Sequence, residues 1–290
     1  MPETPTYVQV FERAQDPERP IWVYAARLGA GDWSPDRHMT MEIGMVLDGR
    51  HDSRLDGGST WWPGDIWLRD MWEPHEWRIS SPTAEILSFM FMPEAIDRRL
   101  FQRDWREMFI VPVSQRPRVT ESKVRDAVLR VASEVWRAII EQTPSRYALI
   151  YLGLHRLLVE MDCHWSGPVK GAEWRDHFAR IRPALELVDS HPGERISAAH
   201  AAHICGLSRS HFDALFRELI KMPFGRYMTR TCVGLACQQL LWTDLSVEVI
   251  ARTTGFVDAS HLHRNFVRFL GCTPAQYRRS GPMRGTGLLP

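Results

Sequence analysis

Two segments near the end of the chain repeat one another at an offset of roughly fifty residues. The first reader, our name for residues 197–219, has the sequence SAAHAAHICGLSRSHFDALFREL. The second reader, residues 246–270, has the sequence SVEVIARTTGFVDASHLHRNFVRFL. In each, a serine (Ser197 or Ser246) can cap a short helix, and a glycine (Gly206 or Gly255) can end that helix in the left-handed conformation. A second helix is expected after each glycine.

These second helices have apolar residues at helical spacing, which predicts one buried face. The apolar residues are Phe212, Leu215 and Phe216 in the first reader, and Leu262, Phe266 and Phe269 in the second. A small residue on each preceding helix, Ala202 or Ala251, lets the two helices cross closely. The pattern predicts two helix-turn-helix units, whose second helices enter the DNA major groove.

The second reader and the residues after it resemble one protein family. The segment IARTTGFVDASHLHRNFVRFLGCTPAQYRR follows the pattern I-A-x3-G-F-x3-S-x-F/L-x-R-x-F-x4-G-x-T-P-x2-Y-R of the AraC/XylS transcription regulators. The resemblance extends from Trp174 to Arg279. Cys232 and Gln239 depart from the residues usual in the family, which are Arg and Leu, and this puts the local stability of the connecting helix in doubt.

The resemblance implies which side chains meet DNA. The predicted DNA-contacting residues are Arg209, Ser210, Asp213 and Arg217 in the first reader, and Ser260, His261, Arg264 and Arg268 in the second. Arg209 and Arg268 are the expected phosphate contacts, and the others are expected on the groove side together with Ala214. Because Asp213 and Ala214 offer guanine no strong donor, we expect the second reader to carry much of the base discrimination. The alternative is that all these side chains are merely solvated.

Length and charge agree with a separate DNA-binding part. A chain of 290 residues is long for a single core, so two domains are expected. Residues 172–290 contain 15 Lys and Arg against 10 Asp and Glu, whereas residues 1–171 contain 21 against 25. The net charges of +5 and −4 indicate that a polyanion meets the C-terminal part.

The N-terminal part has the pattern of a β domain, because short apolar runs alternate with Gly, Pro, Asp and Ser clusters up to Pro93. Helical periodicity follows after Pro117, and the stretch GPVKG at 167–171 interrupts it. We therefore predict an α+β chain of two domains. Its expected parts are a cupin-like effector-binding β-barrel at 1–117, a helical connector with possible dimerisation helices at 118–166, an all-α DNA-binding domain at 172–280 and a flexible tail at 281–290.

The spacing D-x-H-x3-E-x6-G, from Asp36 to Gly49, resembles the first cupin motif with Asp in place of its first His. The stretch WWPGDIWLRDMWEPHEW resembles the effector domains of AraC-type regulators. The resemblance implies a small ligand-binding barrel. His38, Glu42 and His75 are the residues that would suit a metal site, but regulators of this kind generally lose the metal, so no metal or other cofactor is expected.

Seven of the 12 tryptophans lie before Pro93, and aromatic walls bind flat organic molecules and sugars. We predict an effector pocket formed by His38, Glu42, Trp67, Arg69, Trp72, His75 and Trp77, with Glu73 as a further polar contact. The effector is expected to be a sugar or an aromatic metabolite. The alternative is that most of these tryptophans form the core.

The leading hypothesis is a ligand-responsive transcription regulator without enzymatic activity. Its expected partners are double-stranded DNA, the effector, RNA polymerase and a second copy of the chain, joined through helices at 121–161 that could equally pack on the barrel. A metal-dependent cupin enzyme is the alternative, although a helix-turn-helix repeat has no role in one. A DNA-repair methyl acceptor is remote, because the N-terminal half lacks zinc-binding cysteines.

The sequence also indicates where such a protein would act. The five cysteines are scattered without CxxC pairs, which indicates reduced thiols. The N-terminus lacks the pattern of a signal peptide, and no stretch of about 18 apolar residues follows, so a cytoplasmic protein that does not enter a membrane is expected.

Overall fold

The computed structural model describes residues 8–13, 21–36, 40–54, 58–71, 73, 75–101, 104–167 and 171–280. The chain divides into two compact units, Met1–Gly167 and Pro168–Pro290. Each unit has its own core and is described by itself. Among the described residues, no helix combines the length and the apolar character that a membrane crossing requires.

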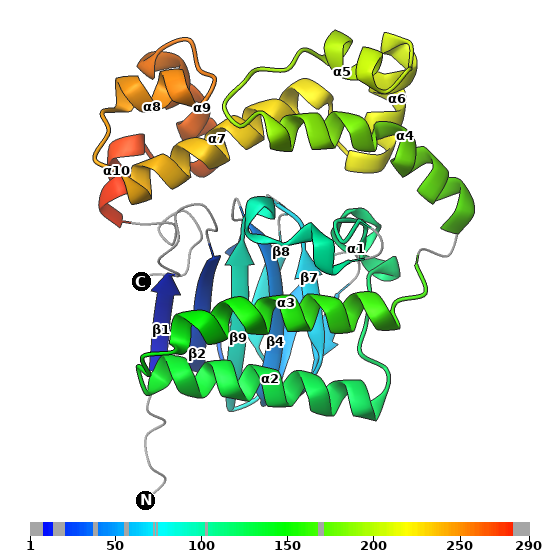
Figure 1. Cartoon of the computed structure of the whole chain (residues 1–290). Coiled ribbons are helices and arrows are strands. Elements are labelled where there is room, and N and C mark those ends of the chain that lie inside the picture. Colours follow the sequence, from blue (N-terminus) through cyan, green and yellow to red (C-terminus); the bar gives the residue numbers. More distant parts are fainter. Residues whose placement is uncertain are drawn as a thin grey trace, which may run out of the picture. The chain divides into compact units, whose positions relative to one another are not determined.

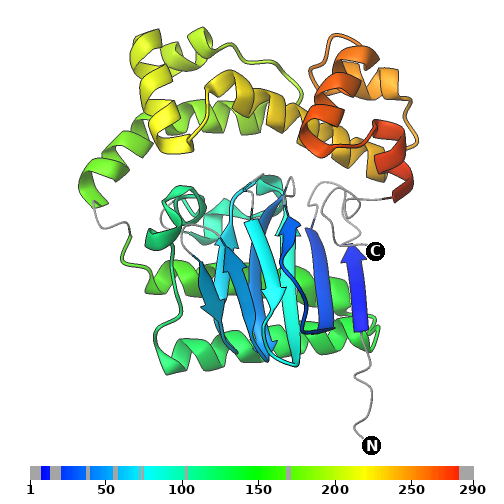
Figure 2. The same ribbon diagram turned by 180° about the vertical axis from the view of Figure 1, so that it is seen from behind.

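The N-terminal unit contains two antiparallel sheets (Figures 1 and 2). The five-stranded sheet has the order β1 (Val8–Arg13), β2 (Ile21–Gly29), β9 (Thr83–Phe91), β4 (Met41–Asp48) and β7 (Ile66–Arg69). The four-stranded sheet has the order β3 (Ser34–Asp36), β8 (His75–Ile79), β5 (His51–Arg54) and β6 (Ser59–Trp61). The predicted β domain is thus present.

Two long helices, α2 (Ser122–Ile140) and α3 (Arg146–His164), cover one face of the five-stranded sheet (Figure 1). Gly153 on α3 lies so close that an added Cβ would be 2.7 Å from Val135 on α2 and 3.7 Å from Phe89 on β9. The connection from β9 to α2 contains α1 (Glu107–Ile110) and the 3-10 turns Pro93–Ala95, Arg98–Leu100 and Val113–Gln115. The helices predicted after Pro117 therefore pack on the sheet.

Strand β4 is buried on both of its faces, because residues 41–46 are all buried. Side chains alternate along a strand, so Ile43 shares with Phe89 the face toward the helices, whereas Glu42 points to the other face. The spacing from Asp36 to Gly49 that resembles the first cupin motif does not lie on a single strand. Asp36 belongs to β3, where it pairs with His75, and β4 begins at Met41.

The C-terminal unit contains only helices in its described residues. The first reader consists of α5 (Ala198–Ile204) and α6 (Arg209–Ile220), and the second of α8 (Val247–Thr253) and α9 (Ala259–Leu270). Helix α4 (Gly171–Ser190) precedes the first reader, α7 (Phe224–Trp242) joins the two readers, and α10 (Pro274–Ser280) follows the second (Figure 1).

The predicted capping residues of the two readers are confirmed. The Ser197 hydroxyl accepts a hydrogen bond from the backbone N–H of His200, and the Ser246 hydroxyl accepts one from that of Val249. The glycines that follow the two short helices have φ angles of +62° at Gly206 and +82° at Gly255. Both lie in the left-handed region, where glycine is favoured over residues with a Cβ.

The loop between α4 and α5 packs on the second reader. Its Gly193, with a φ angle of +86°, is so close to α8 that an added Cβ would be 2.2 Å from the carbonyl oxygen of Thr253. At Gly255, an added Cβ would be 2.8 Å from the carbonyl oxygen of Gly193. The two glycines thus let two backbone segments meet where no side chain fits between them.

Candidate nucleic-acid interface and ligand pocket

Helix α9 of the second reader has one buried and one exposed face. Leu262 and Phe266 are buried, as the apolar spacing predicted, and Phe269 is half-buried. The exposed side chains of the helix are Ser260, His263, Arg264, Val267 and Arg268. Four residues of this helix were predicted to contact DNA. Three of them, Ser260, Arg264 and Arg268, share its exposed face.

His261 is the predicted DNA contact that differs. It is half-buried, and its ring meets that of Phe256 edge to face, with 5.3 Å between the ring centres. Its backbone N–H donates to the side chain of Asp258, the N-cap of α9. His261 therefore helps to hold the start of the helix. His263 is exposed but was not among the predicted DNA contacts. Its position next to Arg264 and three residues after Ser260 would have indicated that it lies on the exposed side of the helix.

Helix α6 of the first reader buries Phe212, Leu215 and Phe216, as predicted. The predicted contacts Arg209, Ser210 and Arg217 are exposed, and Asp213 is half-buried. The Nε of Arg209 donates a hydrogen bond to Oδ2 of Asp213 at 2.6 Å. Two of the four predicted contacts in this reader thus pair with each other.

The charge of the two recognition helices differs. Helix α6 contains two arginines and two acidic residues and has no net charge, whereas α9 contains two arginines and no acidic residue. DNA phosphates attract positive charge, so the α9 face is electrostatically the better suited to DNA. The charge favours the second reader for contacts to phosphates, and its role in base discrimination stays a prediction.

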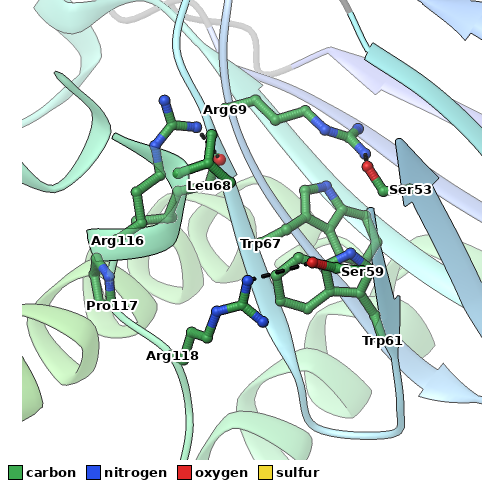
Figure 3. Close-up of a pocket in the computed structure, with 10 residues that line it drawn as sticks. Ser53, Ser59, Trp61, Trp67, Leu68, Arg69, Arg116, Pro117 and Arg118 are labelled. Carbon is green, nitrogen blue, oxygen red and sulfur yellow. Dashed lines mark hydrogen bonds between the residues drawn. The ribbon is translucent and has the colours of Figure 1, made fainter. Parts of the chain in front are cut away.

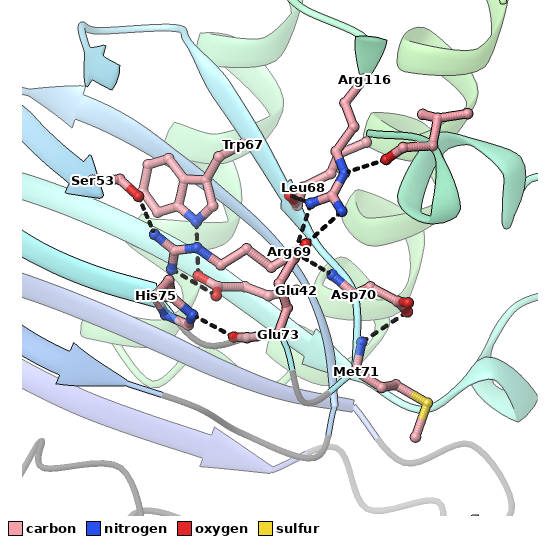
Figure 4. Close-up of polar contacts among 11 residues, drawn as sticks. Glu42, Ser53, Trp67, Leu68, Arg69, Asp70, Met71, Glu73, His75 and Arg116 are labelled. Atoms are coloured by element: carbon pink, nitrogen blue, oxygen red, sulfur yellow. Dashed lines mark hydrogen bonds and ion pairs between the residues drawn. The ribbon is translucent and has the colours of Figure 1, made fainter. Parts of the chain in front are cut away.

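Polar side chains from both sheets meet inside the N-terminal unit (Figure 4). The carboxylate of Glu42, on β4, is 2.9 Å from each of three donors: the indole Nε1 of Trp67, the Nη1 of Arg69 and the hydroxyl of Ser88. Arg69 also donates to the Ser53 hydroxyl on β5 at 3.4 Å. Because Glu42 and Arg69 are both buried, loss of either partner would leave an unpaired buried charge.

His51, on β5, lies in an aromatic stack inside the same unit. Its ring is parallel to that of Trp67 at 4.4 Å between centres, and Trp77 stacks on it at 5.9 Å. Burial, and secondarily the positive charge of Arg69, lowers the pKa of His51 to about 3. The ring is therefore neutral at physiological pH. His51 was not among the predicted effector residues.

The described members of the predicted metal set do not fit a metal ion. Glu42 is neutralised by Arg69 and accepts two further hydrogen bonds. The Nδ1 of His75 is 2.9 Å from the carbonyl oxygen of Glu73, and its Nε2 is 3.7 Å from Asp36. His38 lies outside the described residues, and those described contain no group of three His, Cys, Asp or Glu that could hold a metal ion.

A pocket lies between the sheets and the segment that leads to α2 (Figure 3). The space that water-sized molecules can enter in it is small, about 20 Å³. The lining residues are Ser53, Ser59, Trp61, Trp67, Leu68, Arg69, Val113, Arg116, Pro117 and Arg118. The pocket therefore combines aromatic walls with arginine and hydroxyl donors.

The predicted effector residues are thus brought together only in part. Trp67 and Arg69 line the pocket, whereas Glu42 contacts both of them from the interior. Trp77 stacks on His51, and His75 lies beside Asp36. Trp72 lies outside the described residues. Arg116 and Arg118 were missed, because no local periodicity indicates that their segment returns to the sheets.

Comparisons with known proteins agree with the two units. Residues 201–280 match a family model described as a helix-turn-helix domain. RclR of Escherichia coli, an RCS-specific HTH-type transcriptional activator, is 34% identical over 100 residues, which are 34% of this chain and 34% of RclR. AarP of Providencia stuartii, another HTH-type transcriptional activator, is 29% identical over 100 residues, 34% of this chain and 74% of AarP.

The similarity to RclR covers about a third of that protein, and both activators match over a single stretch of this chain. Solved structures match over far more of it. ToxT of Vibrio cholerae strain SCE256, with a bound unsaturated fatty acid, has a TM-score of 0.52 at 12% identity and covers 96% of this chain and 97% of its own. Another crystal form of ToxT has a TM-score of 0.56 at 12% identity and covers 89% and 98%.

The solved structures are similar to this chain in fold, whereas the family model and the curated relatives are similar to it in sequence. The ToxT structures show the fold alone, an N-terminal unit with antiparallel sheets and a C-terminal helical unit. The family model matches residues 201–280, which contain the second reader and most of the first. The C-terminal unit is therefore a helix-turn-helix domain with two such units, on a chain with the two-domain fold of ToxT.

Proposed function

We propose that this protein is a sequence-specific DNA-binding transcription regulator whose activity is controlled by a small molecule bound in the N-terminal unit. The observation that carries the proposal is the exposed face of α9, which presents Arg264 and Arg268 opposite the buried Leu262 and Phe266. Arginines on one face of a recognition helix are suited to guanine edges and to phosphates. The relatives RclR and AarP are named as transcriptional activators, which supports this function.

Control by a small molecule is supported by the pocket and by the ToxT structures. ToxT has been solved with an unsaturated fatty acid and with (E)-4-(8-methylnaphthalen-1-yl)but-3-enoic acid bound. In this chain, Trp67 and Arg69 line the pocket of the N-terminal unit. A pocket with aromatic walls and a few polar groups is the usual form of a small-molecule site.

The proposal includes further partners. A second copy of the chain is supported by α3, where Leu152 has 61% of its surface exposed. RNA polymerase is a partner of transcription activators in general. Because chromosomal DNA is the target, we propose that the protein acts in the cytoplasm. The cupin-enzyme alternative is not favoured, because the Glu42 carboxylate that would bind a metal is paired with Arg69.

The test uses the purified full chain. DNA fragments that it retains from the genome that encodes it are sequenced, and a shared motif is sought. Its affinity for a duplex with this motif and for a scrambled duplex is then measured over a salt series. We expect tighter binding of the motif and a steep loss of affinity with salt, because bound phosphates release counterions. Equal affinity for both duplexes would refute sequence-specific regulation.

A further inference from the structure

The two recognition helices present different chemistry at equivalent positions. Counted from the N-caps of α6 and α9, Asp213 corresponds to His263. By the same count, Ala214 corresponds to Arg264. The first reader thus has a carboxylate and a methyl group where the second reader has an imidazole and a guanidinium. A carboxylate on a recognition helix needs its own explanation, because DNA phosphates repel it.

Asp213 lies among short side chains on the side of α6 that faces away from the core. Phe212 and Phe216 are buried, whereas Ser210 and Ala214 are exposed and Asp213 has 37% of its side chain exposed. Residues three and four apart are neighbours on a helix surface, so Asp213 lies beside Ser210. Short side chains let the helix come close to base edges in the major groove, within reach of the Asp213 carboxylate.

One oxygen of this carboxylate is occupied within the helix. The Nε of Arg209 donates a hydrogen bond to Oδ2 of Asp213 at 2.6 Å. In the part of the chain that the structure describes, no donor is bonded to the other oxygen, Oδ1. An ionised carboxylate only accepts hydrogen bonds, so Oδ1 is suited to an N–H group of a bound molecule.

The pairing with Arg209 also makes the carboxylate compatible with DNA. The two opposite charges are in contact, so together they have no net charge toward the phosphates. The hydrogen bond also holds the carboxylate in one orientation on the helix. Arg209 therefore acts as a positioning residue for Asp213.

The base edges of the major groove differ in what they offer to an acceptor. Guanine and thymine present acceptors there, which repel a carboxylate, whereas cytosine and adenine each present an amino group. Adenine has the acceptor N7 beside its amino group, and cytosine has no such acceptor. We propose that the first reader selects a C·G base pair, because Oδ1 of Asp213 accepts a hydrogen bond from the N4 amino group of the cytosine. This inference rests on the proposed function, since it names a base that the regulator recognises.

The experiment selects duplexes that bind the full chain from a random pool, and repeats the selection with variants. The unchanged chain should enrich a motif that has, at one position, cytosine over each other base by at least about fivefold. Asp213→Asn should change the preferred base at that position to adenine, because an amide accepts from N6 and donates to N7. Asp213→Ala should accept all four bases there about equally.

Glu218→Gln is the matched control, because it removes an exposed negative charge from the same helix. It should leave the preferred base unchanged at every position of the motif. Arg209→Gln should weaken binding to the cytosine-containing duplex by at least about fivefold, because it leaves the carboxylate unpaired near the phosphates. Adding Asp213→Asn to Arg209→Gln should restore binding, with adenine as the preferred base. Thermal melting followed by circular dichroism checks that each variant is folded.

The outcomes separate this inference from the proposed function. If the chain enriches a motif and neither Asp213 variant changes a preferred base, the assignment of Asp213 to cytosine is overturned and sequence-specific binding stands. The assignment is also overturned if the Asp213 variants, like Glu218→Gln, change only the overall affinity. If the unchanged chain enriches no motif, the proposed function itself fails, and the assignment fails with it.

Discussion

The guanidinium of Arg209 is hydrogen-bonded to the carboxylate of Asp213, with Nε and Oδ2 2.6 Å apart on consecutive turns of α6. The pair lies on the face of the first reader that is predicted to meet DNA. Since Asp213 neutralises Arg209 locally, the positive charge available to phosphates there is reduced.

Asp213→Ala is therefore expected to strengthen binding to scrambled duplex DNA and to increase the salt slope by about one unit, because Arg209 is freed to contact a phosphate. Gel-shift titrations over a salt series measure both effects. Glu218→Ala is the control, because it removes an exposed acidic residue from the same helix. If both variants have the same effect, only net charge matters and the pair has no specific role.

Arg264 and Arg268 are expected to differ in what they recognise. Arg264→Ala should reduce operator binding by about 1 to 3 kcal/mol and binding to scrambled DNA by less, because a bidentate contact to guanine is lost. Arg268→Ala should weaken both and lower the salt slope by about one unit, as expected for a phosphate contact. An unchanged ratio of operator to scrambled affinity in Arg264→Ala would show that Arg264 does not read a base.

The two histidines of α9 provide a third test. His263→Ala should change the preferred operator sequence and leave the melting temperature nearly unchanged, because the side chain is exposed. His261→Ala should instead lower the melting temperature, because its ring packs on Phe256. Selection of bound sequences from a random duplex pool, together with thermal melting, separates the two. A changed operator preference in His261→Ala, and a lower melting temperature in His263→Ala, would mean that His261 enters the groove.

The contrast between these histidines shows how far the sequence predicts the site. Local signals, such as Ser246, Gly255 and the apolar spacing from Leu262, were sufficient for the helices and for their buried face. The orientation of His261 depends on Phe256, which lies across a turn. The pattern of one helix does not contain that contact.

The contacts of the N-terminal unit were harder to predict from the sequence for the same reason. The alternation of apolar residues predicts strands but not their partners, and Asp36 and Glu42 lie on different sheets. Arg116 meets Glu73 across many intervening residues. Such contacts are set by the packing of distant segments, so the predicted effector residues included Trp67 and Arg69 of the pocket but not Trp61, Arg116 or Arg118.

Acid is expected to destabilise the N-terminal unit through His51. Its folded-state pKa of about 3 is below the ordinary value of 6.5, so between these values the unfolded chain binds a proton that the folded chain does not. The free energy of unfolding therefore has its full value, with respect to His51, above pH 6.5. It decreases as the pH falls toward 3, by up to about 1.4 kcal/mol per pH unit.

Chemical denaturation followed by tryptophan fluorescence over this pH range measures the slope. His51→Phe keeps a flat ring in the stack but cannot be protonated, so its free energy of unfolding should depend less on pH. His203→Gln changes an exposed histidine of the other unit and should leave the slope as it is. A His51→Phe chain with the unchanged slope would contradict the role of His51.

The equivalent glycines of the two readers should respond differently to alanine. Gly206 has open space around its α-carbon, so Gly206→Ala should cost only the left-handed strain, about 1 kcal/mol. Gly255→Ala has the same strain and also a contact of 2.8 Å with the Gly193 carbonyl, so its cost should be at least about twice as large. Helical unfolding by circular dichroism measures both. Equal losses of stability in the two variants would mean that the α4–α5 loop can move away from position 255 at no cost.

The backbone contact between Gly193 and Gly255 also limits the spacing of the two DNA sequences that the readers can bind together. Helix α7 joins the readers over 19 residues, about 28 Å at 1.5 Å per residue, while Gly193 ties the loop before the first reader to the end of α8 in the second. Readers fixed in this way have one separation and one angular phase. Inserting about five base pairs between their target sequences turns one of them to the opposite side of the duplex. The length of DNA between the two sequences, whatever its bases, is then recognised as strictly as the bases themselves.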